Sequence, residues 1–337
     1  MENLFSKLIV HQDFFKSIDE LRSRNISLGQ LGAKTYDMEN EVDLEFGKYT
    51  IDGITDVKAI ALDPNDGEFI NKTFKNIISY DESIISFSGL EGQGVPTSHT
   101  LIHLSEDDYI PTSFIVFHFY TRSEVLASNN TTIRRTENVN ESINSDYSKE
   151  RNEFLIKNTS KESIILIDGP LLGKNMSYQT VKLSDELNAN NVIPIFIVKN
   201  SFSNLVINSL RGLKSKYNSD LHWASEFLKN GQRTNFFLYR DVNNPDFAKY
   251  FCYIKSYNKS PQRIELHTNP YNKNKSKIES IMNLIYYYFL VNGNGMNQQV
   301  RPIAIAEEFA RKTLYLFDLK KIMEYTGITP TVNEERF

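Results

Sequence analysis

Apolar and polar positions alternate in blocks along the second half of the chain. Continuous apolar runs at residues 164–167 and 193–198 predict strands that are covered on both faces. A helical pattern precedes each run, at residues 149–157 and 181–187. Further helices are predicted near the C-terminus, at residues 277–290, 303–312 and 316–325. This order predicts an α/β fold, with a mixed β-sheet flanked by helices and a helical C-terminus.

The first half of the chain has a less regular pattern. Apolar residues at helical spacing predict an N-terminal helical region within residues 1–45. A strand is expected at residues 48–54, and the breaker cluster at residues 63–67 predicts a turn. Residues 112–120 are rich in the aromatic and β-branched side chains that favour strands. Residues 123–146 are polar with almost no apolar periodicity, and they predict a mobile surface loop.

Composition limits the classes of function. The chain has 337 residues, 40% of them hydrophobic and 24% charged, so we expect one elaborated globular domain over residues 1–337. A net charge of -4 gives no general attraction for phosphates, so nucleic-acid binding would need a local basic patch or a metal ion. No apolar run approaches the roughly 20 residues that cross a bilayer, and the N-terminus lacks a secretory signal. We therefore expect a cytoplasmic protein without membrane contact.

Two predicted strands end in the same residues, and this recurrence is the most informative local pattern. Ile-Asp-Gly stands at residues 51–53 and again at residues 167–169. Each Asp-Gly pair taken alone is typical of a turn. Taken together, Asp52 and Asp168 favour a site for Mg²⁺ or Mn²⁺ at one end of a sheet, because these ions prefer oxygen ligands. Such ions activate water and stabilise the leaving oxygen in phosphodiester hydrolysis.

A third carboxylate normally helps to hold two such ions. The predicted helix before the second Asp-Gly pair offers Glu150 and Glu153. Glu153 falls beside the apolar face marked by Phe154, whereas Glu150 lies nearer the first turn, where an acid suits the helix dipole. Glu153 is therefore preferred and Glu150 remains open. A solvated helix acid is the alternative for either residue.

The order of several short motifs resembles the NurA nucleases. After IDG at residues 51–53 come an Arg-x-Glu helix containing Glu153, the segment LIDGPL, and the apolar strand IFIVKNS with Lys199. FCYIK, then QRIEL with Glu265, and finally RPIAIAEEFAR with Glu307 complete the series. The resemblance spans roughly residues 46–326, and the order of the motifs has more weight than any single match.

This resemblance implies an RNase H-like fold and manganese- or magnesium-dependent DNA cleavage, as a 5′-to-3′ exonuclease and single-strand endonuclease. It also implies a homodimer docked on a HerA-type hexameric ATPase, in DNA end processing or phage defence. Carried onto this sequence, the metal carboxylates are Asp52, Glu153 and Asp168. Lys199 and Glu265 are nearby site residues, and Glu265 or Glu307 would complete the ligand shell. Lys199 would contact the scissile phosphate, or it is an ordinary lysine at a strand end.

Two positions differ from the family pattern, and they define the alternative. Ile54 stands where the first motif usually has serine, and Glu307 stands where the closing helix usually has histidine. A catalytically weakened NurA-like subunit that clamps DNA or regulates its ATPase is therefore the alternative function. A sugar-kinase-like phosphotransferase is a second rival, disfavoured because no adenosine-binding glycine motif is recognisable. The glycine-rich loop at residues 89–94 lacks the Gly-Lys-Ser/Thr ending of a P-loop, so ATP hydrolysis would come from a partner.

Overall fold

The computed structural model describes most of the chain from Tyr49 onward, and the fold concerns this part alone. The described residues are 49–73, 76–105, 108–123, 132–173, 176–210, 212–214, 216–257, 260–292, 299–316, 318, 321 and 328–331. None of the helices in these ranges has the length and apolar character needed to span a membrane.

Thirteen strands of the described chain form one mixed sheet. Its main path runs in the order β1-β11-β12-β13-β9-β8-β3-β5-β6-β7, with β2, β4 and β10 paired beside this path. The strands are β1 (Tyr49–Asp52), β2 (Ala59–Ala61), β3 (Ile77–Ile84), β4 (Phe87–Ser88), β5 (Gln93–Ser105), β6 (Asp108–Thr121), β7 (Ile133–Arg135), β8 (Ile164–Asp168), β9 (Ile193–Val198), β10 (Gln232–Thr234), β11 (Phe237–Asp241), β12 (Ala248–Lys255) and β13 (Gln262–His267). The pairs β3–β8, β8–β9 and β6–β7 are parallel, and the other pairs are antiparallel.

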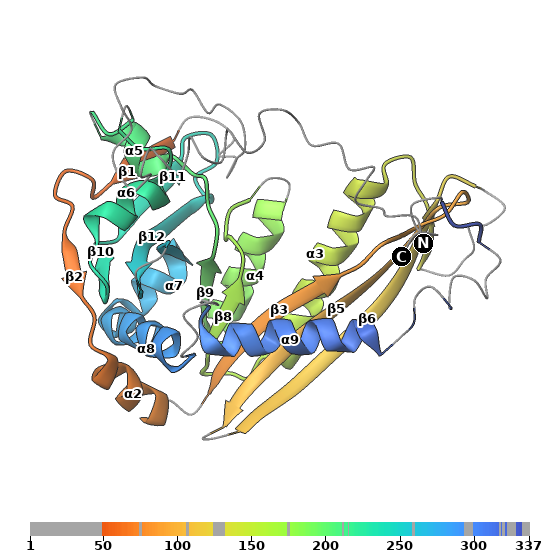
Figure 1. Cartoon of the computed structure of the whole chain (residues 1–337), viewed down its shortest axis with the longest axis horizontal. Helices are drawn as coiled ribbons and strands as arrows, with labels where there is room; N and C mark the ends of the chain where they lie inside the picture. Colours follow the sequence, from red (N-terminus) through yellow and green to blue (C-terminus); the bar gives the residue numbers. More distant parts are fainter. Residues whose placement is uncertain are drawn as a thin grey trace, which may run out of the picture.

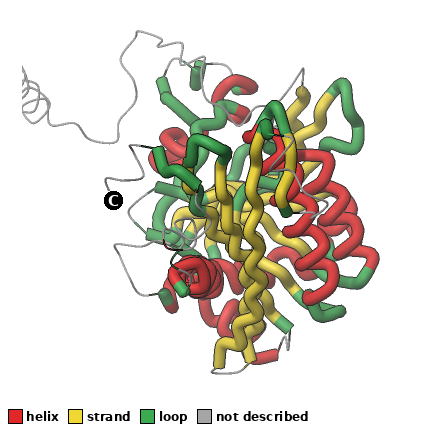
Figure 2. Tube along the Cα trace, turned by 90° about the vertical axis from the view of Figure 1, so that its right-hand side faces the viewer, coloured by secondary structure: helices red, strands yellow, loops and turns green. Residues whose placement is uncertain are grey.

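Helices cover both faces of this sheet, so the molecule has three layers (Figures 1 and 2). The helical elements are α2 (Pro64–Thr73), α3 (Val139–Asn158), α4 (Ser177–Ala189), α5 (Leu205–Ser209), α6 (Asp220–Phe227), α7 (Thr268–Lys273), η3 (Lys275–Lys277), α8 (Ile278–Val291) and α9 (Arg301–Tyr315). Apolar residues of α3, α4, α5 and α6 share one buried cluster with the sheet. Residues of α8 and α9 share a second cluster on the opposite face.

The alternation of side chains along β8 explains how one strand serves both clusters. Ile165 and Ile167 belong to the cluster with α3 and α4, whereas Ile164 and Leu166 belong to the cluster with α8 and α9. Side chains two residues apart point to the same face, so Asp168 lies on the α9 side of the sheet. Since β8 is parallel to its neighbours β3 and β9, their carboxyl ends lie at one edge of the sheet.

The structure confirms the predicted fold class, a mixed sheet flanked by helices and followed by a C-terminal helix. The predicted N-terminal helical region at residues 1–45 lies outside the described residues, as does most of the helix predicted at residues 316–325.

Two local predictions were wrong. The turn predicted at residues 63–67 is the start of α2, because Pro64 suits the first helical position and the carboxylate of Asp63 accepts from the amide N–H of Asn65 at 2.9 Å. The loop predicted at residues 123–146 contains β7 and the first turns of α3 in its described part.

The beginning of α3 lacks the apolar periodicity that would have identified it. Polar contacts hold this part of the helix instead. The side chain of Asn138 caps the helix by accepting from Glu141 N, and Asp146 is buried against Arg134 and Tyr120.

Candidate active site

Four charged side chains from four elements meet at the carboxyl edge of the parallel strands. Asp81 belongs to β3, Asp168 is the last residue of β8, Lys199 follows β9, and Glu307 lies on α9. The parallel register pairs Tyr80 with Ile167, so the next residues, Asp81 and Asp168, are side by side. We call these four residues the acidic cluster.

Helix α9 closes this cluster from one face of the sheet. It crosses β3, β5 and β6 in Figure 1. The hydroxyl of Ser79 donates to the carbonyl of Pro302 at 2.8 Å, which fixes the start of α9 against β3. Ile303, Ala306 and Ala310 are on the buried side of α9. Glu307, the residue after Ala306, therefore lies at the boundary between the sheet and solvent.

The ammonium of Lys199 is the centre of the acidic cluster. Its Nζ lies 2.8 Å from Asp168 Oδ2, 3.3 Å from Glu307 Oε2 and 3.8 Å from Asp81 Oδ2. Asp81 is 5% exposed, and its Oδ2 has no hydrogen-bond partner. A buried carboxylate oxygen that accepts no hydrogen bond is costly, and the Lys199 ammonium at 3.8 Å is too distant to donate one.

The charges of the acidic cluster alter one another's protonation. Burial, with the nearby charge of Asp168, raises the pKa of Asp81 to about 8. Burial also raises the pKa of Asp168, against the opposing effect of Lys199. Burial would lower the pKa of Lys199, but the surrounding carboxylates raise it above its ordinary value, so the ammonium stays charged. At neutral pH a proton on Asp81 therefore relieves the repulsion between carboxylates.

A network of buried charges on the other face of the sheet holds the two segments that follow Asp168 and Lys199. Glu265 Oε2 accepts from Leu171 N at 2.8 Å, just after Asp168. Glu265 Oε1 accepts from Lys249 Nζ at 2.8 Å and from Arg263 Nε at 2.6 Å. Arg263 in turn donates to the hydroxyls of Ser201 and Ser203, beyond Lys199.

A comparison with known protein families identifies the family of this chain. A model described as the NurA domain matches residues 100–312, more than half of the chain. The chain belongs to the NurA family. No curated protein matches the sequence.

One solved structure agrees with this fold. The crystal structure of the NurA nuclease from Sulfolobus solfataricus is similar with a TM-score of 0.52 and 9% identity, covering 94% of this chain and 98% of that one. A second NurA crystal structure reaches a TM-score of 0.41 with 11% identity, covering 90% and 94% of the two chains. At this identity the first likeness supports the fold alone, and the second is too weak to support an argument.

Asp52, predicted to meet Asp168, lies elsewhere in this NurA chain. Strand β1 is five strand positions from β8, which corresponds to about 24 Å at the usual strand spacing. The side chain of Asp52 is 56% exposed and forms an ion pair with Arg240 on β11. The structure therefore does not bring Asp52 into the acidic cluster.

The two glutamates considered as a third metal ligand also lie apart from the acidic cluster. Glu153 is 69% exposed, and its only described ion pair joins it to Lys149 one turn away. Glu150 faces the sheet instead, where its Oε1 is 2.5 Å from His118 Nε2 and its Oε2 is 3.9 Å from His99 Nε2. The preference for Glu153 as the inward-facing acid was wrong, because the helix turns Glu150 toward β5 and β6.

Asp168, Lys199 and Glu307, all named from the sequence, come together, whereas Asp81 was not anticipated. The signal for Asp81 is the segment Ile-Ser-Tyr-Asp-Glu-Ser at residues 78–83. This strand contains isoleucine residues, an aspartate and a serine two positions after the aspartate. The first motif of the family usually has the same aspartate-to-serine spacing, at the positions of Asp52 and Ile54 in this chain. Polar residues within the strand hid this pattern from a search for apolar runs.

A groove beside α9 borders the acidic cluster at Glu307. It has a volume of about 450 Å³ and contains the basic side chains of Arg301, Arg311 and Lys312. Arg311 pairs with Glu307 one turn before it, so the groove and the cluster share a residue. Tyr315, which is 80% exposed, lies at the far end of the groove.

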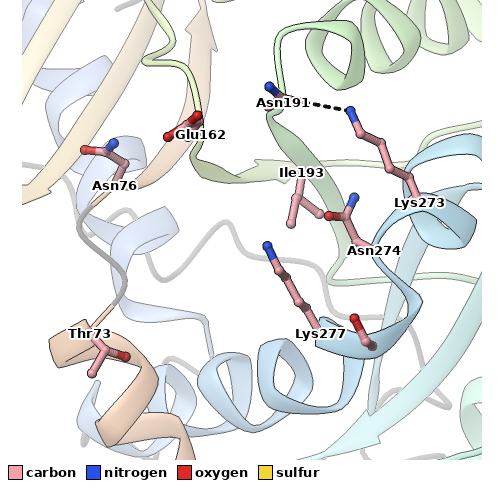
Figure 3. A pocket seen from close by; sticks show the side chains of 9 residues that line it. Thr73, Asn76, Glu162, Asn191, Ile193, Lys273, Asn274 and Lys277 are labelled. Atoms are coloured by element: carbon pink, nitrogen blue, oxygen red, sulfur yellow. Dashed lines mark hydrogen bonds between the residues drawn. The ribbon is translucent and has the colours of Figure 1, made fainter.

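A different pocket, shown in Figure 3, has a volume of about 570 Å³. Asn76, Glu162 and Ile193 line it at the amino ends of β3, β8 and β9. Lys273 on its wall donates to Asn191 Oδ1 at 2.9 Å. This pocket is thus at the edge of the parallel strands opposite to the acidic cluster.

Proposed function

We propose that this NurA-family chain is a divalent-metal-dependent deoxyribonuclease. The observation that carries the proposal is the acidic cluster at the carboxyl edge of the central parallel strands, in a chain of this family. The proposed activities are 5′-to-3′ exonuclease and single-strand endonuclease cleavage. A homodimer that works with a HerA-type hexameric ATPase, in DNA end processing or phage defence, completes the proposal.

The residues of the acidic cluster fit a hard cation such as Mn²⁺ or Mg²⁺. In the described ranges, no group of three or more His, Cys, Asp or Glu side chains is arranged to hold a metal ion. However, Asp81 Oδ2 is buried without a hydrogen-bond partner, and burial together with the nearby charge of Asp168 raises the pKa of Asp81. A cation would contact this oxygen and would favour the ionised form of Asp81. Asp81 and Asp168 would hold the cation, with Glu307 as the third carboxylate.

The chain's own residues then have separate tasks in cleavage. A bound cation would supply activation of the attacking water and stabilisation of phosphate charge. Lys199 keeps its positive charge among the carboxylates, and it would move from Asp168 to a phosphate oxygen when DNA enters. Arg301 and Lys312 in the groove beside α9 would hold the phosphates on one side of the cut. The buried Glu265 would position the Asp168 loop without touching the substrate.

End-labelled single- and double-stranded DNA, incubated with the full chain and Mn²⁺, tests this proposal. Cleavage should require the metal and should disappear in Asp168→Asn, which removes the charge without changing the size of the side chain. The melting temperature of Asp168→Asn should match or exceed that of the wild type, which excludes unfolding as the cause. A wild-type chain that cleaves neither DNA, alone or with its ATPase, would instead support the alternative of a clamping or regulatory subunit.

A further inference from the structure

Phe202 presents an aromatic ring to solvent close to the acidic cluster. Its side chain is 68% exposed, whereas Ser201 and Ser203 on either side of it are each 5% exposed. It lies three residues after Lys199, so the two Cα atoms are at most roughly 11 Å apart. A large apolar side chain between two buried residues is held outward, and it cannot retreat into the core.

The backbone on both sides of Phe202 is fixed by buried hydrogen bonds. Arg263 Nη1 donates to Ser201 Oγ at 2.7 Å and to Ser203 Oγ at 2.6 Å. Ser203 Oγ also donates to Asp220 Oδ2 at 3.3 Å, and Asp220 N donates to Ser203 O at 2.9 Å. The loop is therefore a rigid support, and a ring displayed on it loses little conformational entropy on binding.

The same buried network links Phe202 to the chemistry of the site. Arg263 is ion-paired with Glu265, and Glu265 holds the amide of Leu171 in the loop after Asp168. One pair of fully buried charges thus fixes both the exposed ring and the carboxylate that faces Lys199. A ring with a fixed position relative to the reacting phosphate can set the register of a substrate.

We propose that Phe202 stacks on an unpaired base of the DNA strand and so places the adjoining phosphate at Lys199 and the acidic cluster. This inference rests on the proposed function. Exposed aromatic side chains stack on single strands in a sequence-tolerant way, because every base has a π-face. A base inside a duplex is already stacked on both sides, so Phe202 would favour single-stranded or frayed ends.

Cleavage of a short single strand that lacks one base at a defined position gives the decisive test. Phe202→Ala should lower kcat/KM on the intact strand roughly five- to a hundredfold, mostly through KM. Phe202→Tyr, which keeps the ring, should restore it, and Phe202→Leu should not. On the strand that lacks the stacked base, wild type and Phe202→Ala should cleave equally. Phe69→Ala, which removes a ring that is 62% exposed on α2, is the matched control without effect.

Binding without cleavage separates this inference from the proposed nuclease activity. In an Asp168→Asn background, a strand with 2-aminopurine at the stacked position should lose fluorescence on binding, and Phe202→Ala should abolish that loss. Quenching that is unchanged by Phe202→Ala would overturn the inference, even if the wild type is an active nuclease. An equal effect of Phe202→Ala on intact and base-free strands would also overturn it, and would assign the ring to a protein contact instead.

Discussion

The same three residues, Ile-Asp-Gly, end strands β1 and β8, but the two copies have different surroundings. In both, the glycine has a left-handed backbone, with φ of 84° at Gly53 and 99° at Gly169. Asp52 at the first site pairs with Arg240 in solvent at an outer strand of the sheet. Asp168 at the second site lies between two parallel strands and meets Lys199 beneath α9. The chemical environment of the same local sequence therefore depends on the strands beside it.

Removing one ion pair near each of the two Ile-Asp-Gly segments should give the largest contrast in stability. Glu265→Gln leaves Lys249 and Arg263 fully buried without their carboxylate, at an expected cost of roughly 3–5 kcal/mol in the free energy of unfolding. Arg240→Ala breaks the exposed pair with Asp52 and should cost less than about 1 kcal/mol. Urea unfolding followed by circular dichroism measures both. Equal costs would contradict the difference between the two regions.

Neutralising one aspartate in each region should separate them in activity. Asp81→Asn should lower Mn²⁺-dependent DNA cleavage by roughly a hundred- to a thousandfold, because an amide cannot ionise to hold the cation that the proposed function places at Asp81. Asp52→Asn should leave cleavage within about twofold of the wild type, since β1 is far from β8. Initial rates of cleavage of labelled DNA measure the effects of both substitutions. A loss confined to Asp52→Asn would restore the assignment made from the first Ile-Asp-Gly.

The two glutamates of α3 allow a comparable contrast in pH dependence. Burial alone would raise the pKa of Glu150, but the hydrogen bond with His118 and the nearby ring of His99 lower it to about 2. The folded state therefore favours the ionised form. Its stabilisation, up to about 3 kcal/mol, is present above the unfolded value near pH 4.5 and is lost as the pH falls toward 2.

Glu150→Gln should thus flatten the fall in unfolding free energy between about pH 5 and pH 2. Glu153→Gln, on the exposed face of the same helix, should leave that slope unchanged. Thermal melts at a series of pH values measure the slope. The same slope in wild type and Glu150→Gln would show that Glu150 does not bond His118 in solution.

The smallest expected effects come from the two glycines of the repeated motif. An alanine at either position is strained by the left-handed backbone, and each substitution should cost roughly 1–2 kcal/mol of stability. The added Cβ at position 53 would also lie 3.0 Å from Phe236 O, whereas the one at position 169 would meet nothing within 4 Å. Only Gly169→Ala should slow cleavage, by a few-fold, since it moves Asp168. Melting temperatures and cleavage rates together check this.

Several site residues could be found from the sequence. Asp168 ends a continuous apolar strand, so it stands out against an apolar background, whereas Lys199 and Glu307 were named through the order of motifs that resembles the family. Asp81 could not be found in the same way, because its strand also carries Ser79 and Glu82 and lacks a clean apolar run. Glu265 was named as a site residue, but its role in holding Leu171 depends on a contact across 94 positions of sequence.

By itself the sequence determined the α/β class, the central strands and Asp168, because these depend on local periodicity and strand ends. The order of short motifs, which resembles the family, added Lys199 and Glu307. Only the tertiary structure decided which aspartate joins Asp168. That choice depends on strand order, which places β3 next to β8 and leaves β1 at an outer position. Strand order follows from packing between distant segments, and two identical Ile-Asp-Gly sequences contain no information about their neighbours.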